Sequence, residues 1–143
     1  MGRLLAIDYG TKRTGIAVTD PLKIIPTGLA TVRTFQLMEY LKQYFQKERV
    51  ECVIVGLPRQ MNNKLSENAE HVMLFVKQFK KSFPDIPVEF YDERFTSVIA
   101  QKSMIESGMK KKDRQNKAIV DEISATIILQ GYMESRAYKN KEI

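Results

Sequence analysis

The sequence has few of the residues that build disulfides and zinc sites. Its 143 residues contain one cysteine, Cys52, and one histidine, His71. One cysteine forms no disulfide within the chain, and this pair is too small a set for a typical zinc site. Cys52 lies in the apolar run "ECVIVGL", which predicts a buried small hydrophobe, and His71 is expected on a solvated helix face with no role. We therefore expect a reduced, cytoplasmic protein.

Long apolar runs and segments of biased composition are also lacking. No run approaches the roughly 20 residues that span a bilayer, so no membrane partner is expected. The start, "MGRLLAIDYG", has too short an apolar stretch for a secretory signal. We find no internal repeat or linker and predict a single domain over residues 1–136, followed by a polar tail over residues 137–143.

Positive charge is in excess. The formal net charge is +6 and the isoelectric point about 9.4, which favours a polyanionic partner. The densest basic run is "KKKDRQNK", residues 110–117. It has two interpretations, a solvated loop between helices or part of a nucleic-acid interface.

The first half of the chain has strand-like patterns before helical ones. Residues 3–8 and 14–19 read as two strands of a hairpin around "YGTKR", and a third strand within "IIPTGLATV" is weakened by Pro26 and Gly28, as at a sheet edge. Thr34 is expected to cap the helix that follows. The apolar stripe of that helix comprises Leu37, Met38, Leu41, Tyr44 and Phe45.

In the second half, strands and helices alternate. The continuously apolar "CVIVGLP" predicts a strand buried on both faces. After a polar loop comes a helix whose predicted inner face is Ala69, Val72, Met73, Val76 and Phe79. The short strand "VEFYDE" precedes a helix capped by Thr96 or Ser97 and ended by Gly108. The last helix carries a stripe of Ala118, Ala125, Ile128, Leu129 and Tyr132. This order predicts a mixed α/β sheet with helices packed on it.

Three carboxylates stand where an interior disfavours them. Asp8 and Glu93 end predicted strands, and Asp121 falls on the apolar stripe of the last helix. A buried carboxylate is costly unless it is paired, hydrogen-bonded or bound to a metal. If both strands are parallel and central, the three acids converge at one edge of the sheet. Such a cluster suits Mg²⁺ or Mn²⁺, which prefer oxygen ligands.

Each acid also has a purely structural interpretation. Asp8 could make a turn with the amides of the residues that follow it. Glu93 could pair with Arg94, and Asp121 could lie favourably in the first turn of its helix. Their convergence from three elements is what favours a shared site.

Four motifs carry a family resemblance. "AIDYGTKRTGIAVTD", "VGLP", "YDERFTS" and "VDEISATIILQGYM" occur in this order, and together they resemble the YqgF (RuvX) family, whose members are named pre-16S ribosomal RNA nucleases and, earlier, Holliday-junction resolvases. The resemblance covers the chain from about Arg3 to Glu134.

The resemblance implies a ribonuclease H-like fold, with a five-stranded mixed sheet of three antiparallel and two parallel strands flanked by helices. It also implies catalysis with one or two Mg²⁺ or Mn²⁺ ions held by Asp8, Glu93 and Asp121. An ion of this kind activates a water for attack on a phosphodiester, leaving a 5′-phosphate and a 3′-hydroxyl.

Two departures from the family pattern concern the site. The loop after "GLP" reads "RQMNNKLSENAE", with Asn62 and Asn63 where Asp and Gly are usual. The last-helix motif usually has two adjacent alanines, and here only Ala125 is kept. Glu122 follows Asp121, but a helix turns it about 100° away, so it is a poor substitute ligand.

The expected activity is hydrolysis of structured RNA, in maturation of the 5′ end of pre-16S ribosomal RNA, acting alone or on a ribosomal particle. Binding of the RNA backbone is expected to weaken with salt. The residues expected to meet phosphates are Lys12, Arg13, Arg59, Arg94, Lys110, Lys111, Lys112 and Arg114.

Three other functions fit parts of the pattern. A Holliday-junction resolvase would apply the same chemistry to branched DNA as a homodimer, whereas the RNA nuclease could be a monomer. "DYGT" resembles the phosphate loop of sugar kinases and actin-like ATPases, but those enzymes enclose a nucleotide between two such domains. A non-catalytic RNA-binding module would not need the three acids that this chain keeps.

Overall fold

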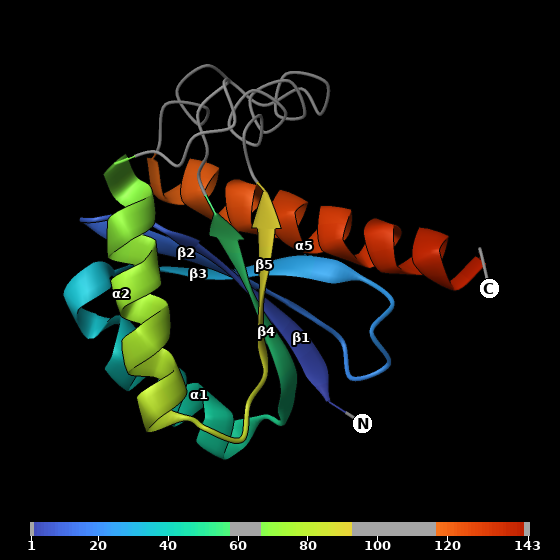
Figure 1. Ribbon diagram of the computed structural model, residues 1–143, viewed down its shortest axis with the longest axis horizontal. Helices are drawn as coiled ribbons and strands as arrows, with labels where there is room; N and C mark the ends of the chain where they lie inside the picture. The colour runs from blue at the N-terminus through green and yellow to red at the C-terminus, as the bar shows by residue number, and fades with distance from the viewer. Residues whose placement is uncertain (1, 58–66, 93–116, 142–143) are drawn as a thin grey trace.

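A computed structural model describes residues 2–57, 67–92 and 117–141 of the chain (Figure 1). Its sheet has the strand order β3-β2-β1-β4-β5. The strands are β1 (Arg3–Tyr9), β2 (Arg13–Thr19), β3 (Pro26–Arg33), β4 (Val50–Leu57) and β5 (Val88–Asp92). The helices are the 3-10 turn η1 (Thr34–Gln36), then α1 (Leu37–Lys47), α2 (Glu67–Ser82) and α5 (Lys117–Lys141).

The sheet combines both kinds of strand pairing, as predicted. β1, β2 and β3 pair antiparallel, whereas β1 with β4 and β4 with β5 pair parallel. The arrowheads of β4 and β5 point the same way in Figure 1. The predicted mixed α/β sheet of three antiparallel and two parallel strands is therefore confirmed. β3 is an edge strand, as Pro26 and Gly28 suggested.

Each face of the sheet has its own hydrophobic core, because successive side chains of a strand point to opposite faces. Leu5 and Ile7 of β1 pack with residues of α1 and α2. Leu4 and Ala6, the alternate positions, pack with α5. Figure 1 shows α1 and α2 on one side of the sheet and α5 crossing the other. Alternate residues of a strand, the odd and even positions, therefore meet different helices; below we call this alternation the parity of a strand residue.

Helices α1 and α2 bury the apolar stripes that the sequence predicts, except at one position of α2. Leu37 and Leu41 of α1 are buried, and so are Ala69, Val72, Val76 and Phe79 of α2. Met73, expected on the inner face of α2, is 46% exposed, and Phe75 is buried in its place. Phe75 stacks on Tyr9 of β1, with ring centroids 5.1 Å apart, and this aromatic contact fixes the rotation of α2.

The predicted cap by Thr34 was wrong. The residue before α1 is Gln36, which makes no side-chain capping bond, and Thr34 instead begins η1. The Thr34 hydroxyl donates to the carbonyl of Gly10 at 2.6 Å, and its amide donates to the carbonyl of Lys12 at 3.0 Å. A tertiary contact with the β1–β2 turn has taken the place of a local cap.

The last helix is longer than expected. α5 continues across Arg136 to Lys141, into the segment predicted to be a polar tail. The residues there include alanine, arginine and lysine, which favour helix, and neither glycine nor proline. The helix predicted after Thr96 or Ser97 lies outside the described residues. Among the helices that the structure describes, none is long and apolar enough to cross a membrane.

Candidate active site

The candidate site lies at the edge of the sheet where the parallel strands end. β1, β4 and β5 run in the same direction, so their carboxyl ends share this edge. Asp8 stands one residue before the end of β1, and β5 ends at Asp92. Ligands of α/β sheets bind outside the carboxyl ends of the strands.

Asp8 and Asp121 are brought together by Gly15. Asp8 pairs with Gly15 in the register of β1 and β2. Asp8 has the parity of Leu4 and Ala6, so its side chain belongs to the face that α5 covers. A Cβ built on Gly15 would lie 3.1 Å from the Cβ of Asp121 and would collide with its backbone carbonyl. The missing side chain thus lets α5 approach β2 beside Asp8.

Arg13 pairs with one of the two acids. Its Nε donates to Oδ2 of Asp121 at 3.0 Å, and the two side chains are 34% and 22% exposed. The sequence placed Arg13 near the acids as a phosphate-binding residue. In the structure its guanidinium balances the charge of Asp121 and holds the carboxylate toward the carboxyl end of β1, since β2 begins at Arg13.

The structural interpretation of Asp121 as an acid of the first helical turn does not hold. α5 already begins at Lys117, so Asp121 is past the first turn, which carries no acid. Glu122 lies elsewhere, as predicted: its side chain borders Gly28 of β3, and a Cβ built there would be 3.4 Å from the Glu122 Cβ. Adjacent acids on α5 thus meet different strands.

Lys12 is exposed on the turn that joins β1 to β2. Both bonds from Thr34 hold this turn, and the Thr14 and Thr34 hydroxyls also lie 3.0 Å apart. An exposed ammonium on a fixed turn, close to Asp8 in the chain, is well placed to meet a phosphate at the site edge.

Several predicted site residues lie outside the described residues. They are Glu93, Arg59, Arg94, Lys110, Lys111, Lys112 and Arg114. Asp8 and Asp121 therefore supply two of the three predicted carboxylates within the described chain. Among residues 2–57, 67–92 and 117–141, no three acid, histidine or cysteine side chains lie together as a metal site would need.

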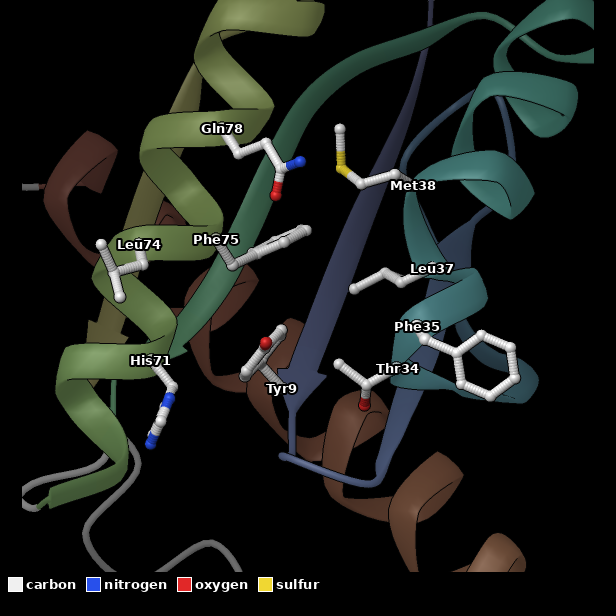
Figure 2. A pocket seen from close by; sticks show the side chains of 9 residues that line it. All are labelled: Tyr9, Thr34, Phe35, Leu37, Met38, His71, Leu74, Phe75 and Gln78. Carbon is white, nitrogen blue, oxygen red and sulfur yellow. The ribbon is translucent and has the colours of Figure 1, made fainter.

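A pocket of about 350 Å³ opens on the opposite face of the sheet, between α1 and α2 (Figure 2). The rings of Tyr9 and Phe75 lie inside it, and the Gln78 amide points across it toward Met38. Figure 2 shows Phe35 at the rim, with its ring directed away from the pocket. No pattern in the sequence indicates this pocket, because it depends on how two helices pack.

Gly15 is the site residue that sequence reasoning missed. It stands in the middle of β2, where a glycine weakens a strand and often marks a close approach of another backbone. The glycine is visible in "RTGIAVT", but the sequence does not show which backbone approaches it.

Comparison with known proteins gives concordant results. A family model described as "RuvX: Holliday junction resolvase" matches residues 2–135. A protein of Phocaeicola vulgatus is 63% identical over 138 residues, covering 96% of this chain and 99% of its own, and one of Bacteroides fragilis is 59% identical over 136 residues, covering 95% and 99%. Both carry the name "Putative pre-16S rRNA nuclease".

A solved structure shares the fold. Thermus thermophilus RuvC in complex with a Holliday junction substrate matches with a TM-score of 0.56 and 18% identity, over 96% of each chain. This likeness supports the ribonuclease H-like fold that the motifs implied. Family model and relatives both extend over nearly the whole chain, and we conclude that it belongs to the RuvX family.

Proposed function

We propose that this protein is a metal-dependent endonuclease that hydrolyses phosphodiester bonds of structured RNA, in the maturation of the 5′ end of pre-16S ribosomal RNA in the cytoplasm. The observation that carries the proposal is the meeting of Asp8 and Asp121 across Gly15, at the carboxyl edge of the sheet. Two carboxylates that meet where a strand ends against a packed helix repel each other, and such a pair suits a site for a hard cation.

Glu93 completes the proposed set of ligands. Glu89 and Tyr91 of β5 contact Tyr132 and the α5-side core, and Glu93 is the next position of the same parity in the sequence. All three donors are carboxylates, which fits Mg²⁺ or Mn²⁺, one or two ions. When bound, such ions neutralise charge on a phosphodiester and make water a better nucleophile.

The chain's own side chains have separate tasks in this proposal. Asp8, Asp121 and Glu93 hold the cation, and Arg13 fixes the orientation of the Asp121 carboxylate through the 3.0 Å bond. Lys12 and Arg94 bind phosphates next to the scissile bond. Arg59 and the basic side chains of residues 110–114 hold the RNA backbone further away, an electrostatic contribution that salt weakens.

Pre-16S RNA is proposed as substrate because close relatives carry that name and because the chain is basic. A small basic domain obtains general affinity from phosphates, whereas selection of one cleavage position requires more contacts. We propose that the ribosomal particle supplies them.

Asp8→Asn is the direct test. The substitution keeps the size of the side chain but removes the negative charge that would hold the cation, so cleavage should fall by at least about 100-fold. Purified wild type and variant are incubated with labelled pre-16S RNA, alone and within precursor particles, with Mg²⁺, Mn²⁺ or EDTA. Asp85→Asn is the matched control, because Asp85 is exposed at the opposite edge, before β5. Full activity of Asp8→Asn would overturn the assignment of the ligand.

Resolution of Holliday junctions is the second candidate function. It is favoured by the description of the family and by the likeness to RuvC, which was solved with a junction. A resolvase cuts two symmetric strands and should act as a homodimer. Four-way DNA junctions belong in the same assay: cleavage of junctions without cleavage of RNA, by a dimeric protein, would establish this function instead.

A further inference from the structure

Phe35 is an aromatic side chain that the fold leaves in solvent. It is 84% exposed, the most exposed large apolar side chain in the described part of the molecule. A single exposed apolar residue has little meaning by itself. The position of Phe35 is what calls for an explanation, because this residue is anchored to the turn that carries Lys12.

The anchoring comes from the neighbouring residue. Thr34 is bonded to the carbonyls of Gly10 and Lys12, at 2.6 and 3.0 Å, and lies 3.0 Å from the Thr14 hydroxyl. Phe35 is therefore held beside a turn that begins two residues after Asp8. It is also presented by the short η1 turn, so few backbone rotations separate it from this anchor.

Two basic residues lie near Phe35, one in the anchored turn and one at the end of β3. Lys12 and Arg33 are both exposed, and Arg33 is the register partner of Arg13 at the start of β2. The nearest acid along the chain in α1, Glu39, accepts a bond from Gln43 Nε2 at 3.2 Å. Exposed cations near an exposed aromatic residue are typical of a surface that binds single-stranded nucleic acid, where the cations contact the phosphates and the ring stacks on a base.

The side chain of Phe35 lies in solvent. Its ring is directed away from the pocket between α1 and α2, and the pocket itself lies on its inner side (Figure 2). A base could stack on this ring without displacing any side chain that lines the pocket. In contrast, the rings of Tyr9 and Phe75 are already stacked on each other.

We propose that Phe35 stacks on an unpaired base of the RNA, while Lys12 and Arg33 hold the adjoining phosphates, so that a single-stranded segment crosses the sheet edge from the acids toward α1. This inference rests on the proposed function and adds a preference for RNA with an unpaired segment beside the scissile bond. Recognition of single-stranded RNA commonly uses such stacking on aromatic side chains.

Binding is measured in EDTA, where no cleavage occurs, with labelled oligoadenylate and with an abasic phosphate oligomer of equal charge. Phe35→Ala should weaken binding of oligoadenylate about 5- to 150-fold and leave binding of the abasic oligomer unchanged. Phe35→Tyr should restore it. Ile24→Ala is the control, because Ile24 is 64% exposed on the loop after β2, at the other edge of the sheet. Unchanged binding of oligoadenylate by Phe35→Ala would overturn the proposal.

A spectroscopic test needs no estimate of affinity. The chain contains no tryptophan, so Phe35→Trp introduces a single indole, whose emission can be excited apart from that of the tyrosines. Oligoadenylate should quench its emission, because a stacked base quenches indole, whereas Ile24→Trp should respond weakly. Equal responses of the two variants would contradict stacking at Phe35. If wild type cleaves RNA but Phe35→Ala binds oligoadenylate normally, only the stacking is wrong; if stacking holds and no RNA is cleaved, only the nuclease proposal is wrong.

Discussion

At two turns of this chain, one polar side chain hydrogen-bonds to backbone groups and holds the loop. Thr34 fixes the turn between β1 and β2, and Asp20 organises the loop between β2 and β3. The Asp20 carboxylate accepts bonds from the amides of Ile24 and Ile25, both at 2.8 Å, and from Leu22 at 3.1 Å. Lys23, with φ of 60°, is the one non-glycine residue with positive φ in the described chain, and these bonds hold it there.

Asp20→Ala should therefore destabilise the protein in a pH-dependent way. The bond from the Ile25 amide, with those from Ile24 and Leu22, lowers the pKa of Asp20 below its ordinary value of 3.8. A carboxyl whose pKa is lower in the folded state contributes stability above its unfolded pKa, and this contribution is lost as the pH falls through the folded pKa. The difference in unfolding free energy between wild type and variant should be full at about pH 7 and smaller at about pH 3.

Urea denaturation at the two pH values measures this difference. Asp85→Ala serves as the comparison, since Asp85 is exposed and its loss should cost little at either pH. A gap between wild type and Asp20→Ala that stays constant with pH would show that the charged form of Asp20 does not stabilise the loop.

Among the elements, α5 decides whether Asp8 and Asp121 meet at the candidate site. It crosses β2 at Gly15 and β3 at Gly28, and its own Gly131 makes room for the ring of Tyr91. The first contact is the tightest, because a Cβ on Gly15 would meet the backbone of Asp121, which cannot rotate away. At Gly28 the built Cβ would lie 3.4 Å or more from its neighbours.

Gly15→Ala and Gly28→Ala should differ for that reason. The first forces α5 off the sheet and should lower the free energy of unfolding by about 1–3 kcal/mol, as overpacking of an interior does. It should also reduce cleavage, since it moves Asp121 away from Asp8. Gly28→Ala makes ordinary van der Waals contacts and should cost less than about 1 kcal/mol. Urea denaturation of both variants checks the contrast, and equal midpoints would mean that α5 does not depend on Gly15.

For the whole molecule, the relevant quantity is its charge. A net charge of +6 on 143 residues attracts nucleic acids at long range, and the release of counterions from the phosphates makes the affinity depend on salt. Arg13 is already paired with Asp121, so Lys12 is the described basic residue of the site turn that is free to neutralise a phosphate.

Lys12→Gln should accordingly change the salt dependence of RNA binding. The slope of log affinity against log salt should become shallower by about 0.7 for a single-stranded RNA, the contribution of one phosphate contact. Lys80→Gln, in the last turn of α2, is the matched control and should leave the slope unchanged. Binding titrations over a range of salt concentrations measure both slopes. An unaltered slope for Lys12→Gln would remove Lys12 from the interface.

The sequence by itself determined the strands and the three longer helices of the described residues, and it singled out two acids that meet at the candidate site. Short apolar runs bounded by turn residues predicted five strands, and helical periodicity predicted the apolar stripes of three helices, because the buried side chains of a helix recur with its turn. Asp8 and Asp121 were predictable because a carboxylate is conspicuous at the end of an apolar strand and on the apolar stripe of a helix.

Tertiary structure alone decided the contacts between these elements. Arg13 forms an ion pair with Asp121, and Thr34 bonds to the β1–β2 turn instead of capping α1. On the inner face of α2, Phe75 is buried where Met73 was predicted. Each depends on residues far apart in the chain, and local patterns carry no information on such distances. Gly15 shows the division most clearly: the sequence marked a weak point in a strand, and only the packing of α5 revealed that the missing side chain makes room for Asp121.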